Sequence, residues 1–157
     1  MQIINKQKRE GSVTVIVPFY NEENLIEKKL LNCVELVIPN TSMIVFVNDY
    51  SNDESPNIIR KLTQSINLEK LLVVDNKYSK GKIGAIKTGY EIANTEYVVF
   101  TDADILLNDN AILELSSVLD ANSKIGLTFG EIKKYRTVHQ FLMHICMRLL
   151  SLIDSAV

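Results

Sequence analysis

The sequence predicts an open α/β domain in which a mostly parallel β-sheet is flanked by helices. Short runs rich in Val and Ile do not alternate with polar residues, which is typical of strands buried on both faces. Segments with helical periodicity fill the gaps between these runs. Alternation of the two kinds of segment favours β-α-β units with right-handed crossovers.

Four apolar runs are the expected strands, and a fifth stretch is compatible with another strand. The four runs are residues 13–18, 43–47, 71–74 and 97–100, and the fifth stretch is 125–129.

Five helical patterns accompany these strands, and each predicts a set of inward-facing side chains. Asn21 is expected to cap the first helix, and the second is expected to begin near residues 53–56. The expected inward faces, in chain order, are Ile26, Leu30, Cys33 and Val37; Ile58, Leu62 and Ile66; Ile83, Ile86, Tyr90 and Ala93; Ile112, Leu115 and Leu119; and, within 138–157, Phe141, Ile145, Leu149 and Leu152.

Composition bounds the class of protein. The 157 residues are 46% hydrophobic, which suits one domain over 1–157 with a real core. The net charge of -2 gives no basic footprint for nucleic acid. Cys33 and Cys146 lie in apolar helical patterns, so we expect buried, reduced thiols and a cytoplasmic protein. No signal peptide and no apolar run long enough to span a bilayer is visible.

Acidic residues follow the expected strands at their carboxyl ends, where open α/β sheets bind ligands. Glu22 follows the first strand after a turn, and Asp49, Asp75 and Asp102 follow the next three. Clustering at one edge of one sheet predicts a site, although any one of these residues could belong to a solvated loop.

Asp102 and Asp104 form the sharpest pair. In extended backbone, residues i and i+2 point to the same side, so two carboxylates could share one Mg²⁺ or Mn²⁺ ion. Such an ion could neutralise a diphosphate leaving group. The alternative is a strand end followed by a solvated turn; the fully apolar residues 98–100 favour the functional interpretation.

Residues 79–89 place glycines and lysines at the start of a helix, a combination that attracts phosphate. Gly81 could provide the turn, and Gly84 and Gly89 would let the helix pack closely. A solvated, Lys-rich loop with ordinary helix packing explains the segment equally well. Neither a G-x-G-x-x-G nor a G-x-x-x-x-G-K-[ST] motif is present, which argues against a dinucleotide-binding Rossmann domain and a P-loop protein.

Four segments in order resemble the family 2 inverting glycosyltransferases of the GT-A fold: VTVIVPFYNEE (13–23), VNDYSND (47–53), KGK (80–82) and VFTDAD (99–104). The resemblance covers roughly residues 13–119. The third segment is most similar to polyprenyl-phosphate hexose synthases.

The resemblance implies a site that binds a nucleotide-diphosphate sugar, with UDP favoured and GDP possible. Its implied residues are Pro18, Tyr20 and Glu22 lining the nucleotide pocket, Asp49 reading the base, Lys82 near the diphosphate, and Asp102 and Asp104 as the D-x-D motif with Asp104 in direct metal contact. The implied acceptor is a polyprenyl phosphate or a cell-surface glycan.

The chain also departs from this family. Asn48 and Tyr50 stand for the first Asp and the Gly of the usual D-D-G-S motif, and losing Gly puts the turn geometry in question. The catalytic base is expected on an acceptor side beyond Val157, so the acceptor part is expected to be missing. One alternative is a non-catalytic nucleotide-sugar-binding fragment. Another is a haloacid-dehalogenase-like phosphatase, because Asp102-Ala-Asp-Ile fits its nucleophile motif.

The last helical pattern allows a membrane hypothesis. Its apolar face follows Lys133, Lys134 and Arg136, a combination that suits anionic headgroups. We expect self-association or peripheral contact with the cytoplasmic membrane face, where a lipid-linked acceptor would lie; a helix packed on its own sheet is the simpler alternative.

Overall fold

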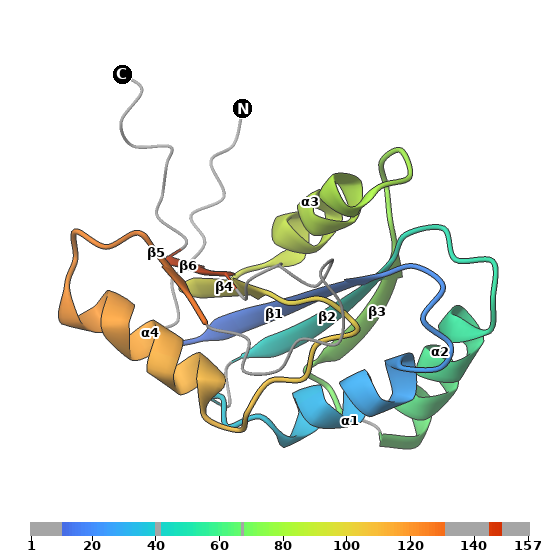
Figure 1. Cartoon of the computed structure of the whole chain (residues 1–157), viewed down its shortest axis with the longest axis horizontal. Helices are drawn as coiled ribbons and strands as arrows, with labels where there is room; N and C mark the ends of the chain where they lie inside the picture. Colours follow the sequence, from blue (N-terminus) through green and yellow to red (C-terminus); the bar gives the residue numbers. More distant parts are fainter. Residues whose placement is uncertain (1–10, 40–41, 67, 131–144, 149–157) are drawn as a thin grey trace.

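A computed structural model describes residues 11–39, 42–66, 68–130 and 145–148. These residues form one six-stranded sheet in the order β3-β2-β1-β4-β6-β5 (Figure 1). The strands are β1 (Val13–Phe19), β2 (Met43–Asn48), β3 (Leu71–Asp75), β4 (Tyr97–Phe100), β5 (Leu127–Phe129) and β6 (Ile145–Arg148). The first four are parallel, and β6 pairs antiparallel with both β4 and β5.

Helices cover both faces of the sheet. They are α1 (Ile26–Glu35), α2 (Ser55–Ile66), α3 (Lys82–Ile92) and α4 (Ala111–Ala121). Figure 1 shows α1, α2 and α4 on one face and α3 on the other. The open, mostly parallel sheet flanked by helices is therefore confirmed. No helix among the described residues has the length and apolarity needed to cross a membrane.

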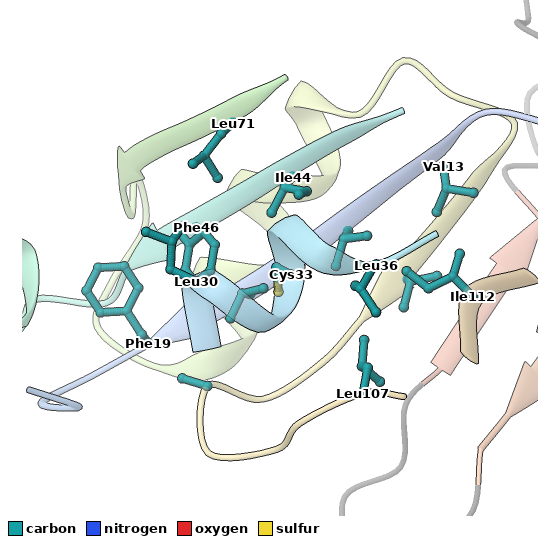
Figure 2. Close-up of a cluster of buried hydrophobic side chains, with 14 of the residues drawn as sticks. Val13, Phe19, Leu30, Cys33, Leu36, Ile44, Phe46, Leu71, Leu107 and Ile112 are labelled. Carbon is teal, nitrogen blue, oxygen red and sulfur yellow. The ribbon is translucent and has the colours of Figure 1, made fainter. Parts of the chain in front are cut away.

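Alternate residues of the central strands feed two cores. Val15, Val17 and Phe46 point to the larger core beneath α1, α2 and α4, where Leu30 and Cys33 pack against them (Figure 2). Their neighbours Ile16, Val45, Val47 and Val98 belong to the second cluster, with Ala85 of α3. This two-sided burial explains why the central strands appear as continuous apolar runs in the sequence, whereas the edge strand β3 is only partly buried although its sequence is equally apolar.

The first helix begins later than predicted. Asn21 does not cap it; Asn21 has a positive φ of 54°, and its side chain accepts a hydrogen bond from the Asn52 amide instead. Ile26, Leu30 and Cys33 are buried as expected. Val37 lies past the helix end, where Leu36 is already extended, and is exposed. The inward face of α4, formed by Ile112, Leu115 and Leu119, is confirmed.

The second helix buries a residue that the periodicity did not select. Ile59 is fully buried, whereas the predicted Ile58, Leu62 and Ile66 are partly buried at the edge of the core.

The inward face of the third helix was predicted only in part: Ala93 is buried in the second core as expected and Ile86 is partly buried, but Ile83 and Tyr90 are not inward. Ile83 is 84% exposed and Tyr90 is also exposed, whereas Ala85, Thr88 and Gly89 face the sheet. A Cβ atom at Gly89 would lie 2.5 Å from Cγ2 of Ile16. The small residues therefore decide the orientation, because only they allow α3 to approach β1 this closely.

The helix expected over residues 138–157 is contradicted at its centre. Residues 145–148 are strand β6, which pairs with β4 over the whole length of that strand. Backbone pairing with β4 and β5 outweighs the local helical period. The rest of that stretch lies outside the described residues, as do Lys133, Lys134 and Arg136; of Cys146, only the backbone pairing is described.

Candidate functional site

The carboxyl ends of the parallel strands open onto a pocket of about 240 Å³. Its lining residues are Pro18, Phe19, Tyr20, Glu22, Asp49, Lys82, Asp102, Ala103 and Asp104. All seven site residues named from the sequence are among them. Asp75, the other strand-end carboxylate, is not; it accepts hydrogen bonds from Arg60 and Asn48 instead.

Strand register explains the convergence. Phe19 pairs with Asn48, and pairing continues past the strand end because the Asp49 amide donates to the Phe19 carbonyl at 2.8 Å. β4 ends lower, since Phe100 is level with Ile16. Residues 101–104 therefore run along the end of β1 and bring the D-x-D segment beside the first loop.

A hydrogen-bonded clasp, missed in the sequence, joins the loops after β1 and β2. Backbone amides of the first loop donate to side chains of the second: Asn21 to Ser51 at 3.1 Å, Glu22 to Ser55 at 2.7 Å and Glu23 to Asp53 at 3.1 Å. Backbone amides of the second loop donate to side chains of the first: Asn52 to Asn21 at 2.9 Å and Glu54 to Glu23 at 3.2 Å. The N-E-E and S-N-D-E-S segments therefore also hold the pocket rim together. The density of short polar side chains in both loops was the available signal.

The Asp49 carboxylate holds the loop after β3. It is 6% exposed, and it accepts hydrogen bonds from Asn76 Nδ2 at 2.7 Å and from the Gly81 amide, with both oxygens at 2.9 Å. Gly81 has a φ of 140°, so the expected glycine turn is present. By this count, one lone pair of Oδ2 accepts no hydrogen bond from the described residues, and Asp49 lines the pocket.

Tyr50 occupies the position of the missing glycine in the turn after β2. It adopts a positive φ of 60°, the left-handed conformation that Gly would take without strain. Its hydroxyl donates to the Tyr78 carbonyl at 2.8 Å, and the next amide, of Ser51, donates to Asn48 Oδ1 at 3.0 Å. These contacts hold the strained turn, so both departures from D-D-G-S take part in preserving its shape.

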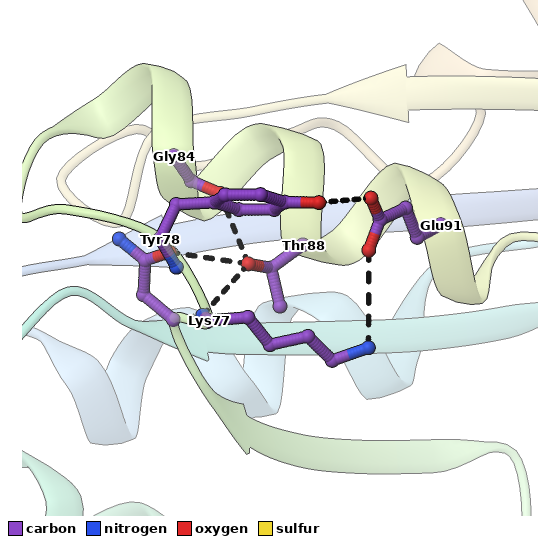
Figure 3. A network of polar contacts seen from close by, with 6 residues as sticks. Lys77, Tyr78, Gly84, Thr88 and Glu91 are labelled. Carbon is purple, nitrogen blue, oxygen red and sulfur yellow. Dashed lines mark hydrogen bonds and ion pairs between the residues drawn. The ribbon is translucent and has the colours of Figure 1, made fainter.

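A polar network fixes the loop after β3 onto α3 (Figure 3). The Thr88 hydroxyl accepts from the Lys77 amide at 3.0 Å and lies within hydrogen-bond distance of the Gly84 carbonyl. Glu91 accepts from the Tyr78 hydroxyl and pairs with Lys77 at 3.8 Å. The first turn of α3 is thereby held at the pocket, with Lys82 at its start.

Three further carboxylates line the pocket: those of Glu22, Asp102 and Asp104. Lys82 Nζ lies 2.5 Å from Oδ1 of Asp102. Burial raises the pKa of Glu22, and the negative charges of Asp104, Asp53 and Asp102 raise it further. Within the described part of the chain, however, no three His, Cys, Asp or Glu side chains are close enough to hold a metal by themselves.

Lys29 lies beneath these carboxylates and was not singled out in the sequence. It is fully buried, and its Nζ donates to Thr101 Oγ1 at 2.9 Å and to the Ile105 carbonyl. Desolvation lowers the pKa of Lys29, against the opposing effects of Cys33, Asp102 and Asp104. A lysine on the face shared by Ile26 and Cys33 was the available signal.

Sequence comparison finds relatives among poly-beta-1,6-N-acetyl-D-glucosamine synthases. The poly-beta-1,6-N-acetyl-D-glucosamine synthase of Staphylococcus aureus is 28% identical over 127 residues, which is 81% of this chain and 30% of that protein. That of Staphylococcus epidermidis is 28% identical over 124 residues, or 79% of this chain and 29% of that protein. The chain thus spans less than a third of these relatives.

Structure comparison points the same way. A mannosyltransferase, PcManGT from Pyrobaculum calidifontis in complex with GDP-Man and Mn²⁺, matches with a TM-score of 0.68 and 35% identity, over 73% of this chain and 34% of that one. S. aureus TarS (residues 1–349) in complex with UDP-GlcNAc matches with a TM-score of 0.58 and 27% identity, over 71% of this chain and 32% of that one.

The family itself follows from the sequence profile described as "Glycosyl transferase family 2", which matches residues 14–149. This match spans most of the chain, includes every residue of the D-x-D segment, and leaves the phosphatase alternative without support. The chain belongs to glycosyl transferase family 2.

Proposed function

We propose that this chain binds a nucleotide-diphosphate sugar in the pocket at the strand ends and is the donor-binding part of an inverting, metal-dependent glycosyltransferase. The observation that carries the proposal is the convergence of Asp49, Lys82, Asp102 and Asp104 on one pocket from three separate parts of the chain: the loop after β2, the start of α3 and the segment after β4. Bound GDP-Man and UDP-GlcNAc in the two solved relatives support it.

Each wall of the pocket has a proposed role. Pro18, Tyr20 and Glu22 line the nucleotide site, and the remaining lone pair of Asp49 accepts from the base. UDP is favoured and GDP is the second candidate. Lys82 forms an ion pair with Asp102. When the nucleotide sugar binds, Lys82 would exchange this ion pair for a contact with a phosphate oxygen of the nucleotide sugar. In that role it would compensate charge as the diphosphate leaves.

The donor set fits Mg²⁺ or Mn²⁺. These ions bind through one or two carboxylates and complete their shell with water and substrate phosphates. Asp102 and Asp104 supply the carboxylates. Burial raises the pKa of the neighbouring Glu22, and the negative charges of Asp104, Asp53 and Asp102 raise it further, so a cation would relieve part of this effect. When bound, the ion would supply Lewis-acid stabilisation of the diphosphate. Asp104 is the proposed direct ligand because it matches the last position of the D-x-D motif.

The proposal extends to the acceptor and to the place of the reaction. We infer that residues 1–157 belong to a single family 2 domain, in which they form the nucleotide-sugar-binding part, and that the hexose moves to a polyprenyl phosphate or a cell-surface glycan at the cytoplasmic membrane face. The catalytic base is unassigned. Homo-oligomer formation and vesicle binding by residues 131–157 stay predictions, since that stretch, apart from β6, lies outside the described residues.

Titration of UDP and GDP by calorimetry, with and without Mn²⁺, tests the donor site. We expect binding that depends on the ion and favours UDP. Equal affinity in both conditions would remove the metal role. Sugar transfer assayed on the same sample separates an enzyme from the alternative, a domain that binds a nucleotide sugar without turnover.

A further inference from the structure

Lys29 is an unusual residue for the core of this domain. Its side chain has 0% exposure, and a buried ammonium group loses several kcal/mol of hydration unless it is well compensated. Apolar side chains occupy the neighbouring positions of the same helix face, Ile26 and Cys33, and both are also 0% exposed. A methionine could fill this space without burying a charge, so the amine needs a further explanation.

The two acceptors of Lys29 lie on either side of the D-x-D segment. Thr101 precedes Asp102, and Ile105 follows Asp104. Between them the chain turns, with the Ile105 amide donating to the Asp102 carbonyl at 3.3 Å. The Lys29 amine therefore ties together both ends of this turn from below, while Asp102, Ala103 and Asp104 line the pocket above.

We propose that Lys29 is a positioning residue that fixes the turn at 101–105 so that Asp102 and Asp104 face the pocket in the geometry a divalent cation requires. This inference rests on the proposed metal-dependent donor site. It adds a residue that touches neither the pocket nor its ligands.

Electrostatics and geometry predict opposite effects when Lys29 is replaced. A positive charge near two carboxylates weakens their attraction for a cation, so removing the charge alone would strengthen metal binding. Loss of a group that orients metal ligands weakens metal binding by about 10–100-fold. Weaker metal binding after replacement of Lys29 would therefore indicate a positioning role, and stronger metal binding would indicate a purely electrostatic effect.

The test compares Lys29→Met with Lys28→Met, which alters the exposed neighbour on the same helix. The readout is the ratio of UDP dissociation constants without and with Mn²⁺, measured by calorimetry beside thermal unfolding. We expect Lys29→Met to lower this ratio at least about tenfold. The unfolding temperature should fall modestly at the same time, because the Thr101 hydroxyl and the Ile105 carbonyl lose their donor. Lys28→Met should behave as the parent. An unchanged or larger ratio in Lys29→Met would overturn the inference.

Hydrogen exchange of the unliganded protein gives a second readout. We expect faster exchange at the Asp102–Ile105 amides in Lys29→Met and parent-like exchange in Lys28→Met; unchanged exchange would also overturn the inference. If Lys29→Met does not fold, Thr101→Val keeps the shape, removes one acceptor, and should lower the same ratio. A parent chain whose UDP binding ignores Mn²⁺ overturns the proposed function itself, whereas an intact ratio in both Lys29→Met and Thr101→Val overturns only the role of Lys29.

Discussion

The two walls of the pocket differ in how their charges are compensated. The hydrogen-bonded wall, Asp49 with Asn76 and Gly81, satisfies its carboxylate within the protein through three hydrogen bonds. In the acidic wall, Glu22 with Asp102 and Asp104, burial raises the pKa of Glu22 and the nearby negative charges raise it further. The first wall is pre-organised without a ligand, and the second becomes fully compensated with a cation.

Substitutions in the two walls should therefore affect stability and metal-dependent binding differently. A change in the hydrogen-bonded wall should destabilise the fold, because it leaves buried donors without acceptors. A change in the acidic wall should spare or stabilise the unliganded fold and impair metal-dependent binding. The following variants test that division.

Asp104→Asn should give the largest effect on binding. We expect the Mn²⁺-dependent gain in UDP affinity to fall by roughly 100-fold, since a charged ligand contact is worth about 1.5–3 kcal/mol. Calorimetric titration with and without Mn²⁺ measures it. Denaturant unfolding without metal should match the parent, and a variant that binds UDP with undiminished metal dependence would remove Asp104 from the site.

Asp49→Ala should give the largest effect on stability. It strands the Asn76 amide and the Gly81 N–H, so the free energy of unfolding should fall by about 1–3 kcal/mol. UDP binding should weaken and discriminate less against GDP. Urea unfolding and parallel UDP and GDP titrations measure both. The exposed Asp109 is the control, and its replacement by Ala should change stability by less than about 0.5 kcal/mol. A stable Asp49→Ala that binds UDP as the parent does contradicts both roles.

Gly89→Ala tests the support of the hydrogen-bonded wall from α3. The added methyl group would lie 2.5 Å from Cγ2 of Ile16, and overpacking of this kind typically destabilises by about 1–3 kcal/mol. Gly126→Ala is the matched control because nothing lies within 4 Å of the added atom. Thermal unfolding of the pair should separate them clearly; equal melting temperatures would mean that α3 shifts without penalty.

Glu22→Gln should give the smallest effect, and one of opposite sign. The folded-state pKa of Glu22 is raised, so its contribution to stability is present below the unfolded pKa and is lost as pH rises through the folded value. Removing the charge should therefore raise the unfolding temperature slightly at neutral pH without metal, and not below about pH 4. The exposed Glu27→Gln should show no such gain. A Glu22→Gln variant that is less stable at neutral pH would show that burial and repulsion do not destabilise the charged carboxylate.

Local pattern predicted much of the fold and the membership of the pocket. Strands such as β4 are continuous apolar runs buried on both faces, and this property is visible without knowing their neighbours. Once the strands are parallel, their carboxyl ends must share one edge, so Asp49, Asp102 and Asp104 were expected to meet. Their chemical roles remain predictions, since composition and order do not show which group contacts a ligand.

Tertiary contacts alone decided the remaining features. Which face of α3 turns inward depends on the clearance between Gly89 and Ile16, and β6 forms because β4 offers an unpaired edge. Lys29 and its acceptors are more than 70 residues apart in the chain, so no local period could reveal their pairing. Sequence periodicity indicates which side chains share one face of a helix or strand. The partner that makes burial of a charge or a glycine favourable is fixed only when distant segments pack together.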